Sequence, residues 1–428
     1  MIVHLVAGIA LAATTASGTY STHGDKRLQK LIEEALQSNP RVLRAFSDFQ
    51  ASRHRVPQAT SLPDPSVSFT QFARSIETRV GSQQRMVGIS QTIPGLGKRT
   101  AGGQLASKVA DISNRLYDGV RSDVVLRVKQ AYYDLGFLDR ALAANRLYEE
   151  LLDHFETIAR RRYAEGVGLQ RDGLRLQAEI TRALQQRHQL RSQRVRLEAI
   201  LNALRDAPAD TPIAEVSLAD LPQLQLEEQS LLQIGRQERP EIRAAFLSIE
   251  EAEKMLHLAR IRHRPDFNVG LTWGNIRAYG VRMADLPVPG DGKDSYGVSV
   301  GLTVPVFRGK YDAGVREAAE RLNAARFAYR ESATAMESDV RSIAFRIETI
   351  GSQLRLHERT LVPQVEQAFE STLDAYSNGA AEVTGLLEIQ RLLLDVQLGA
   401  ARLRADYLKA AADLERVIGS AVPKRVPS

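Results

Sequence analysis

The residues that could perform chemistry are scattered along the chain. The eight histidines stand at positions 4, 23, 54, 154, 188, 257, 263 and 357. None forms the HExxH pair that places two imidazoles on one helix face to bind zinc. The chain has no cysteine, which excludes disulfides, thiolate metal sites, a cysteine nucleophile and a lipid-modified N-terminal cysteine. No nucleophile stands with a base, so the sequence predicts a protein that is not an enzyme and needs no metal or cofactor.

One glycine-rich segment resembles a phosphate-binding loop. It reads Gly95-Leu96-Gly97-Lys98-Arg99-Thr100. The first glycine of that motif would fall at position 92, which is Thr92, so we interpret the segment as a bend from a strand into a helix. Acid pairs such as Glu149-Glu150 fall on polar helix surfaces, where solvated carboxylates are the default expectation.

Composition favours helices over a wide core. Of the 428 residues, 43% are apolar but only 6% are aromatic, which suits narrow alanine and leucine seams between helices. The 57 basic and 51 acidic residues give a net charge of +6, and the excess is spread along the helices. The run Arg160-Arg161-Arg162 stands beside Glu156 and Glu165, so a solvated helix face is favoured over a polyanion site.

The N-terminus resembles an export signal. Apolar residues fill positions 5–13 and small residues fill 14–18, too short a stretch to span a bilayer as a helix. We predict a signal segment over residues 1–18. The lack of Lys or Arg in residues 1–4 leaves open a different start or a buried helix. No other stretch approaches 18 consecutive apolar residues, which excludes membrane-spanning helices.

The chain repeats itself once. Pro40 aligns with Pro240, Pro94 with Pro305, and Gly166 with Gly379, at offsets of 200, 211 and 213 residues. Three matches in the same order predict two copies of one structural unit. We assign the first repeat to residues 28–206, a proline-containing connector to 207–226, the second repeat to 227–419 and a C-terminal tail to 420–428.

Each repeat contains one pair of predicted strands. The clearest are 267–274 and 296–304, and the first repeat has 66–72 and 85–92. Apolar residues alternate in them with small or polar ones, as in half-buried sandwich strands or in lipid-facing barrel strands. Four strands leave open edges and cannot enclose a barrel, so closure in a membrane requires several copies.

Long helices occupy most of the remaining chain. Residues 100–162 and 311–377 contain almost no helix breaker except Pro363, and at 1.5 Å per residue such helices would run ~90 to 100 Å. The last helix has an a/d pattern typical of helix-on-helix packing. Its members are Leu386, Ile389, Leu393, Val396, Ala400, Leu403, Tyr407, Ala410, Leu414 and Val417.

These features together resemble the TolC family of outer-membrane efflux proteins. The resemblance covers residues 28–419 and rests on the duplication, the strand exits Ile93-Pro94-Gly95 and Val304-Pro305-Val306, and the helix turns at 163–169 and 376–379. Three segments are similar to the heavy-metal cation efflux (CzcC/CusC-like) branch: 62–66, 77–81 and 91–99. Ser82 departs from that branch, which often has proline there.

The resemblance implies a mainly α fold with a small β part. Long antiparallel coiled-coil helices would form an α-barrel across the periplasm, and the connector would lie at its equator. Four strands per chain would contribute to a trimeric, 12-stranded transmembrane β-barrel. Its lipid-facing residues would be Phe267, Val269, Leu271, Trp273, Tyr296, Val298, Val300 and Leu302. For Trp273 and Tyr296 ordinary strand packing remains an alternative to a place at the membrane interface.

The resemblance also assigns roles to the helix turns. Asp172, Tyr376 and Glu388 match positions that close the periplasmic gate, with solvated helix-start acids as the alternative for the two carboxylates. Gly385 stands where an acid occurs in the best-known branch, so the gate here would be built differently or be weaker. Gly166, Val167, Gly168, Leu169 and Gly379 would contact a periplasmic adaptor, and the alternative for this turn is a simple helix stop.

The implied function is that of a passive channel in the outer membrane, extending into the periplasm. The expected partners are two identical copies in a homotrimer, a periplasmic adaptor (membrane fusion protein), an RND-type inner-membrane pump and outer-membrane lipid, with no nucleic acid. Solutes, including heavy-metal cations, would pass through it. The alternatives are a duct for type I protein secretion and a periplasmic coiled-coil adaptor or scaffold.

Overall fold

The computed structural model describes residues 20–278 and 289–424. The predicted signal segment, 1–18, and residues 425–428 of the predicted tail lie outside this part of the chain. The chain forms two compact units. The helical unit comprises the residues up to Phe46, Arg115–Arg243 and the residues from Glu331 onward, and the strand unit comprises Ser47–Asn114 and Ala244–Arg330.

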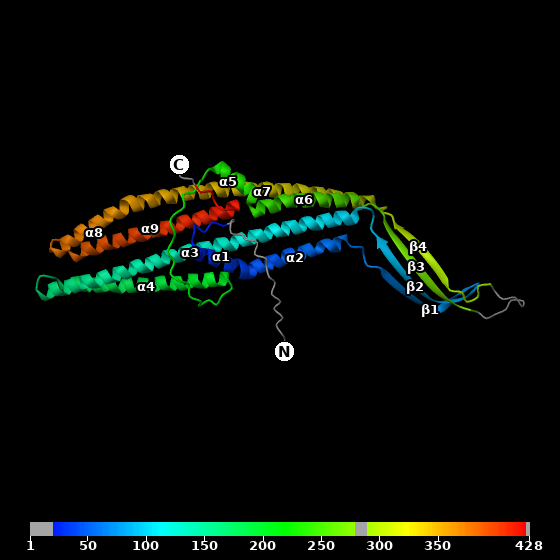
Figure 1. Ribbon diagram of the computed structural model, residues 1–428, viewed down its shortest axis with the longest axis horizontal. Helices are drawn as coiled ribbons and strands as arrows, with labels where there is room; N and C mark the ends of the chain where they lie inside the picture. The colour runs from blue at the N-terminus through cyan, green and yellow to red at the C-terminus, as the bar shows by residue number, and fades with distance from the viewer. Residues whose placement is uncertain (1–19, 279–288, 425–428) are drawn as a thin grey trace. The chain divides into compact units, whose positions relative to one another are not determined.

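The predicted fold class, mainly α with a small β part, is confirmed (Figure 1). The helices are α1 (Lys26–Ser38), α2 (Pro40–Thr60), α3 (Lys98–Ala164), α4 (Gln170–Leu204), α5 (Glu228–Glu238), α6 (Pro240–Ile261), α7 (Arg308–Leu356), the π-helix η1 (His357–Leu361), α8 (Val362–Ser377) and α9 (Val383–Ile418). The strands are β1 (Ser66–Thr78), β2 (Gly81–Ile93), β3 (Asp266–Arg277) and β4 (Ser295–Thr303). Within residues 20–278 and 289–424, none of the helices combines the length and the apolar character that crossing a bilayer demands.

The four strands form one antiparallel sheet in the order β1-β2-β3-β4. Strands β1, β2 and β3 run several residues beyond the predicted ranges, because the alternating pattern gives way to polar residues that still pair near the hairpin turns. Pairing of β2 with β3 joins the two hairpins. A sandwich would need a second sheet, and the described strands form only this one. Strands β1 and β4 each keep one unpaired edge within the chain.

The two faces of this sheet differ in composition. One row of opposed residues runs Val67, Ile89, Leu271, Val298, and the next row on the same face runs Phe69, Val87, Trp273, Tyr296. Rows on the other face run Ser66, Ser90, Gly270, Ser299 and Ser68, Gly88, Thr272, Gly297. The alternation seen in the sequence therefore produces one apolar face and one small, polar face.

The two predicted long helices differ in continuity. Helix α3 is continuous over 67 residues. The stretch predicted as one helix over 311–377 is α7, the single π turn η1 and α8. Pro363 lies at the start of α8 and cannot donate to the carbonyl of Arg359, so the helical ladder is rearranged in the turn before it. The expectation of an unbroken helix was wrong at this point.

Helix α9 follows the predicted seam only in part. Leu386, Leu393 and Val396 are buried in one stripe, and Val365 of α8 packs against the latter two. Beyond Ala400 the buried set widens to include Ala405, Leu408, Ala411 and Ala412. There α9 joins a core built with α1 and α3, and a helix in contact with several neighbours buries more than one stripe.

The core of the helical unit contains a buried ion pair. Lys129 of α3 and Glu415 of α9 are both almost fully buried and form a hydrogen-bonded salt bridge. Burial raises the pKa of the Glu415 carboxyl, and the Lys129 ammonium opposes that rise. Tyr20 lies beside this pair, and the Tyr132 hydroxyl donates to Asp25 at 2.6 Å.

Candidate functional site

Both helical hairpins turn through the same backbone motif. Gly166 follows α3 with φ +76°, and Gly379 follows α8 with φ +78°. The N–H of Val167 donates to the carbonyl of Arg162 at 3.0 Å, and the N–H of Ala380 donates to that of Ala375 at 2.8 Å. These are Schellman caps, which need a left-handed residue that glycine supplies without strain.

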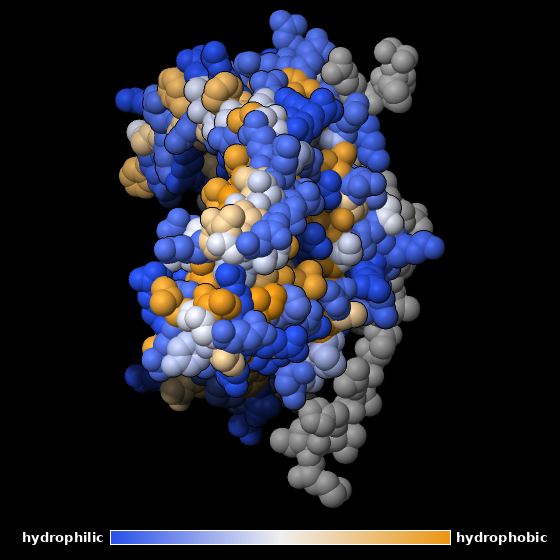
Figure 2. Space-filling model, turned by 90° about the vertical axis from the view of Figure 1, so that its left-hand side faces the viewer, coloured by the Kyte–Doolittle hydropathy of each residue, from blue (hydrophilic) through white to orange (hydrophobic). Residues whose placement is uncertain are grey.

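The first turn presents apolar side chains to solvent. Val167 and Leu169 are exposed, and Gly166 has open space around its α-carbon. Seen from the end of the helical unit that carries the turns, the surface is mainly hydrophilic with apolar groups set among polar ones (Figure 2). Of the residues predicted to contact an adaptor, Gly168 is half-buried and the other four, Gly166, Val167, Leu169 and Gly379, are exposed.

Tyr376 joins the ends of the two hairpins. It is buried, and its carbonyl accepts a hydrogen bond of 3.0 Å from Arg162 at the end of α3. The Arg162 guanidinium also lies 5.4 Å from the centre of the Tyr376 ring, a cation–π contact. Burial raises the pKa of the Tyr376 phenol; Arg162 opposes this rise and the charge of Asp172 adds to it.

Further polar contacts cross between α4 and α9. Arg171 lies 3.8 Å from Asp172 on its own helix and 3.6 Å from Glu382, the N-cap of α9. Arg175 donates to the hydroxyl of Thr384. The predicted gate residue Asp172 therefore belongs to a mixed-charge group that spans both hairpin ends.

Glu179 of α4 makes a buried link between the hairpins. Its carboxylate accepts from the Tyr148 hydroxyl of α3 at 2.9 Å and from Nε of Arg391 of α9 at 2.9 Å, and Nη2 of Arg391 makes a second contact. Arg182 approaches it from one turn along α4, at 3.2 Å. Burial opposes ionisation of Glu179, but the Arg391 and Tyr148 hydrogen bonds outweigh it and hold the pKa of this carboxyl below its ordinary value.

The third predicted gate residue lies apart from this group. Glu388 is exposed on α9, and its side chain makes no hydrogen bond or ion pair within the described part of the chain. A side chain added at Gly385 would meet no atom within 4 Å. The structure thus places Asp172 near enough to Tyr376 for its charge to act on the Tyr376 phenol, whereas Glu388 is exposed in the single chain.

All eight predicted lipid-facing side chains lie on the apolar face of the sheet. They form four opposed pairs across β3 and β4, which are Phe267–Leu302, Val269–Val300, Leu271–Val298 and Trp273–Tyr296. All eight are exposed in the single chain, and an exposed apolar area of this extent marks an interaction surface. The Trp273 indole N–H donates to Asp294 at 3.1 Å.

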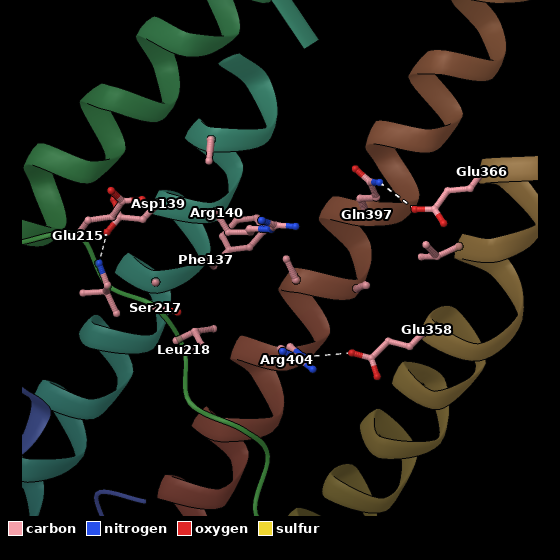
Figure 3. A pocket seen from close by; sticks show the side chains of 16 residues that line it. Phe137, Asp139, Arg140, Glu215, Ser217, Leu218, Glu358, Glu366, Gln397 and Arg404 are labelled. Carbon is pink, nitrogen blue, oxygen red and sulfur yellow. Dashed lines mark hydrogen bonds and ion pairs between the residues drawn. The ribbon is translucent and has the colours of Figure 1, made fainter. Parts of the chain in front are cut away.

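A groove of about 700 Å³ lies in the helical unit between α3, the connector, α8 and α9 (Figure 3). The charged side chains on its walls are mostly paired, Glu358 with Arg404 at 3.1 Å and Glu366 with Gln397 at 3.4 Å. Asp139 accepts from the backbone of Val216 at 2.8 Å and thereby holds the connector on α3. Throughout the described residues, no group of three or more histidine or acidic side chains is arranged to hold a metal ion.

A protein-family model identifies the family of this chain. The family model described as "Outer membrane efflux protein" matches residues 31–205 and 231–420. The chain belongs to this family. The resemblance to TolC-family channels is therefore confirmed, and this efflux protein is a passive outer-membrane channel that extends into the periplasm, not an enzyme.

Known proteins similar to this efflux protein differ in how much of it they match. The pyoverdine export outer membrane protein OpmQ of Pseudomonas putida is 28% identical over 182 residues, which are 42% of this chain and 37% of OpmQ. The cobalt-zinc-cadmium resistance protein CzcC of Cupriavidus metallidurans is 20% identical over 403 residues, covering 92% of this chain and 90% of CzcC. The solved structure of the CusC channel superposes with a TM-score of 0.77 at 15% identity and covers 93% of each chain.

Several residues of the efflux protein make contacts that the sequence did not predict. Arg162 was interpreted as part of a solvated face, yet it contacts Tyr376; its neighbour Arg160 does pair with Glu156, at 2.6 Å. Glu149 was expected on a solvated surface, but it is buried and pairs with Arg187 at 2.5 Å. A long-range partner on another helix gives no periodic signal, so the spacing of charges along one helix could not have revealed these contacts.

Proposed function

We propose that three copies of this chain close one 12-stranded barrel in the outer membrane and act as the passive duct of a tripartite efflux system. The observation that carries the proposal is the sheet, which has one apolar face, one small polar face and two unpaired edges. An apolar outer face suits lipid and a small polar inner face suits a water-filled channel. When identical copies are arranged in rotational symmetry, the unpaired edge of each sheet pairs with the sheet of the next copy, and no open edge is left.

The strand directions support closure by identical copies. The four strands alternate in direction, so β4 of one copy and β1 of the next run antiparallel and continue the ladder without a change of pattern. In this proposal a signal segment at 1–18 directs export. Two structural repeats, 28–206 and 227–419, are joined by the connector 207–226 at the equator of the helical barrel, and a tail follows from 420.

The hairpin ends are proposed to meet a periplasmic adaptor and to form the gate. Gly166, Val167, Gly168, Leu169 and Gly379 would contact the adaptor, which joins the channel to an inner-membrane pump. The contact of Arg162 with Tyr376 and the pairing of Arg171 with Asp172 and Glu382 would hold the idle end closed. Glu388, exposed in the single chain, would face a neighbouring copy.

For cargo we propose heavy-metal cations, because the similarity to CzcC extends over almost the whole chain. The shorter match to OpmQ favours a siderophore as the second candidate. Type I protein secretion uses the same kind of duct. The pump is expected to select the cargo, so the channel's own residues need not bind it.

The test has two parts. Purified protein in detergent should run as a trimer that mild heating dissociates, and it should conduct ions in a planar bilayer; a monomer without conductance would contradict the proposal. Deletion of the gene should then lower the tolerated concentration of cobalt, zinc or cadmium several-fold. Loss of siderophore export or of protein secretion, with metal tolerance unchanged, would reassign the cargo while leaving the channel intact.

A further inference from the structure

An acidic side chain ties the start of β3 to the strand beside it. Oδ1 of Asp266 accepts from the backbone N–H of Gly95 at 2.6 Å and from Nζ of Lys98 at 2.8 Å. Gly95 follows the exit of β2, and Lys98 is the first residue of α3. This contact connects the paired strands β2 and β3 to the bend between β2 and α3. All of these residues lie within the strand unit.

The same sequence elements recur at the two open edges of the sheet. Residues 62–70, LPDPSVSFT, match 264–272, RPDFNVGLT, at an offset of 202 (266 − 64), with proline, aspartate, valine and threonine identical. Asp64 before β1 therefore corresponds to Asp266 before β3. Strand β4 corresponds to β2 at an offset of 211 (305 − 94). That offset places Lys98 on Gly309, and the basic residue directly before it, Arg308, is the first residue of α7 as Lys98 is of α3.

The two side chains at the open edges are unpaired in the part of the chain that the structure describes. Asp64 and Arg308 are exposed, and the side chain of neither makes a hydrogen bond or ion pair within residues 20–278 and 289–424. Asp266, the counterpart of Asp64, is bonded to Lys98, which begins α3 as Arg308 begins α7. The nearby cation Lys310 already lies against the ring of Tyr311, at 5.9 Å.

We propose that β4 of one copy pairs with β1 of the next in a defined register, with Leu302 opposite Val67, and that Asp64 of the second copy forms an ion pair with Arg308 of the first. This assignment deepens the proposed function and rests on it. The register follows from the observed pairing of Gln91 with Val269, to which the two offsets are applied: 91 + 211 = 302 and 269 − 202 = 67.

Each pair in this register joins residues of the same face. Leu302 opposes Val67 and Val300 opposes Phe69 on the apolar face. On the other face, Gly301 opposes Ser68. The register uses residues 66–71 of β1, which is the stretch that pairs regularly with β2 before the irregularity after Gln71. A slip of one residue would place apolar side chains on the small, polar face.

The register also gives a closed barrel an ordinary tilt. A row of opposed residues runs from Val67 through Ile89 and Leu271 to Val298, and in the proposed register it continues to Gln71 of the next copy. It thus advances four residues (71 − 67) per copy. Four residues span about 13 Å along a strand and four strand spacings span about 19 Å. The resulting tilt of about 35° is that of closed membrane barrels.

Disulfide trapping tests the register directly, because the chain has no cysteine of its own. Variants would carry Leu302→Cys with Val67→Cys, or Gly301→Cys with Ser68→Cys. Adjacent opposed pairs alternate between close and wide spacing, so at least one of the two variants has geometry suited to a disulfide. Oxidation of the assembled protein should convert most of the chain to a covalent trimer in at least one of them.

Two control variants show whether trapping depends on the register. Phe267→Cys with Leu302→Cys, opposed within one chain, should oxidise without linking copies. Val300→Cys with Val67→Cys lies on the same face but is displaced by two residues, so it should give at least ten-fold less covalent trimer. Preferential trapping of the displaced pair, or no trapping while the intrachain pair oxidises, would overturn the register. Trimer size and conductance, measured before oxidation, report separately on the proposed function.

Charge reversal tests the ion pair. Asp64→Arg and Arg308→Asp should each lower the yield of trimer several-fold, and the two together should restore most of it. Lys310→Asp, two residues along α7, should have less effect than Arg308→Asp. A double variant no better than the single ones, or a larger effect at Lys310, would overturn the pairing of Asp64 with Arg308.

Discussion

Glu179 of α4 and Arg391 of α9 form a two-point ion pair that joins the first helical hairpin to the second. Glu179 is almost fully buried, whereas the Arg391 side chain is 44% exposed. The pair therefore lies at the rim of the interface between the hairpins, where Arg391 reaches solvent and Glu179 is buried. A carboxylate in this position depends on its partner, because a buried charge without hydrogen bonds is costly.

Replacing Arg391 with methionine should loosen the contact between the hairpins. The Tyr148 hydrogen bond alone would remain at depth, and leaving a buried acceptor poorly satisfied costs about 1–3 kcal/mol. We expect faster proteolysis and faster hydrogen exchange at the α8–α9 turn. Arg182→Met is the matched control, since that side chain is 69% exposed and should change stability by less than about 0.5 kcal/mol. Equal effects of the two variants would show that Arg391 has no special role.

His23 should make the protein less stable as the solution becomes acidic. Burial first, and then the charges of Lys129 and Lys424, lower the pKa of this imidazole to about 4, against about 6.5 in an unfolded chain. The unfolded state then binds more protons than the folded state, so the free energy of unfolding falls as pH drops from 6.5 to 4. His23→Gln should show a weaker decline over this range in denaturant titrations of the detergent-solubilised protein. An unchanged slope would mean that His23 titrates normally.

An acidic residue on the apolar face of the sheet should impair assembly. Val298→Asp, or Val300→Asp, places a charge where lipid is proposed to lie, which costs roughly 2 kcal/mol or more per chain near mid-bilayer. The yield of heat-sensitive trimer should fall sharply. Ser299→Asp, between them on the opposite face, should leave that yield nearly unchanged. The reverse result would show that the faces are assigned the wrong way round.

Bulky residues at the two hairpin turns should uncouple efflux. Gly166→Ile and Gly379→Ile force a β-branched residue into a left-handed conformation, at a cost of roughly 1–2 kcal/mol or more at each position. The turns should distort while the trimer survives, and metal tolerance should fall. Gly173→Ala is the control, because it lies in α4 with open space around it. A double isoleucine variant with normal metal tolerance would remove the turns from the transport mechanism.

The alternation of side chains along the strands was enough to predict the two faces of the sheet. Val269 and Leu271 face one way and Gly270 the other, because neighbouring residues of a strand point to opposite sides. The turns at Gly166 and Gly379 were equally visible, since glycine stands where a helix must end in a left-handed residue. The fold class follows from such local rules, and the structure confirms it.

Contacts between distant helices had no such signal. The bonding of Arg162 to Tyr376 spans 214 residues and that of Glu179 to Arg391 spans 212, and each depends on how two hairpins pack side by side. The π turn before Pro363 likewise shows how the helix adjusts to the missing backbone N–H of the proline. The sequence shows the proline but not the form of that adjustment.

The sequence by itself determined the fold class and the two-faced strands and predicted a duplicated plan, because these depend on periodicity and on the conformational limits of glycine and proline. Only the tertiary structure decided that β2 pairs with β3 in one sheet with two free edges, and which buried charges meet across the hairpins. Those outcomes depend on strand order and on helix rotation, which bring together residues far apart in the chain.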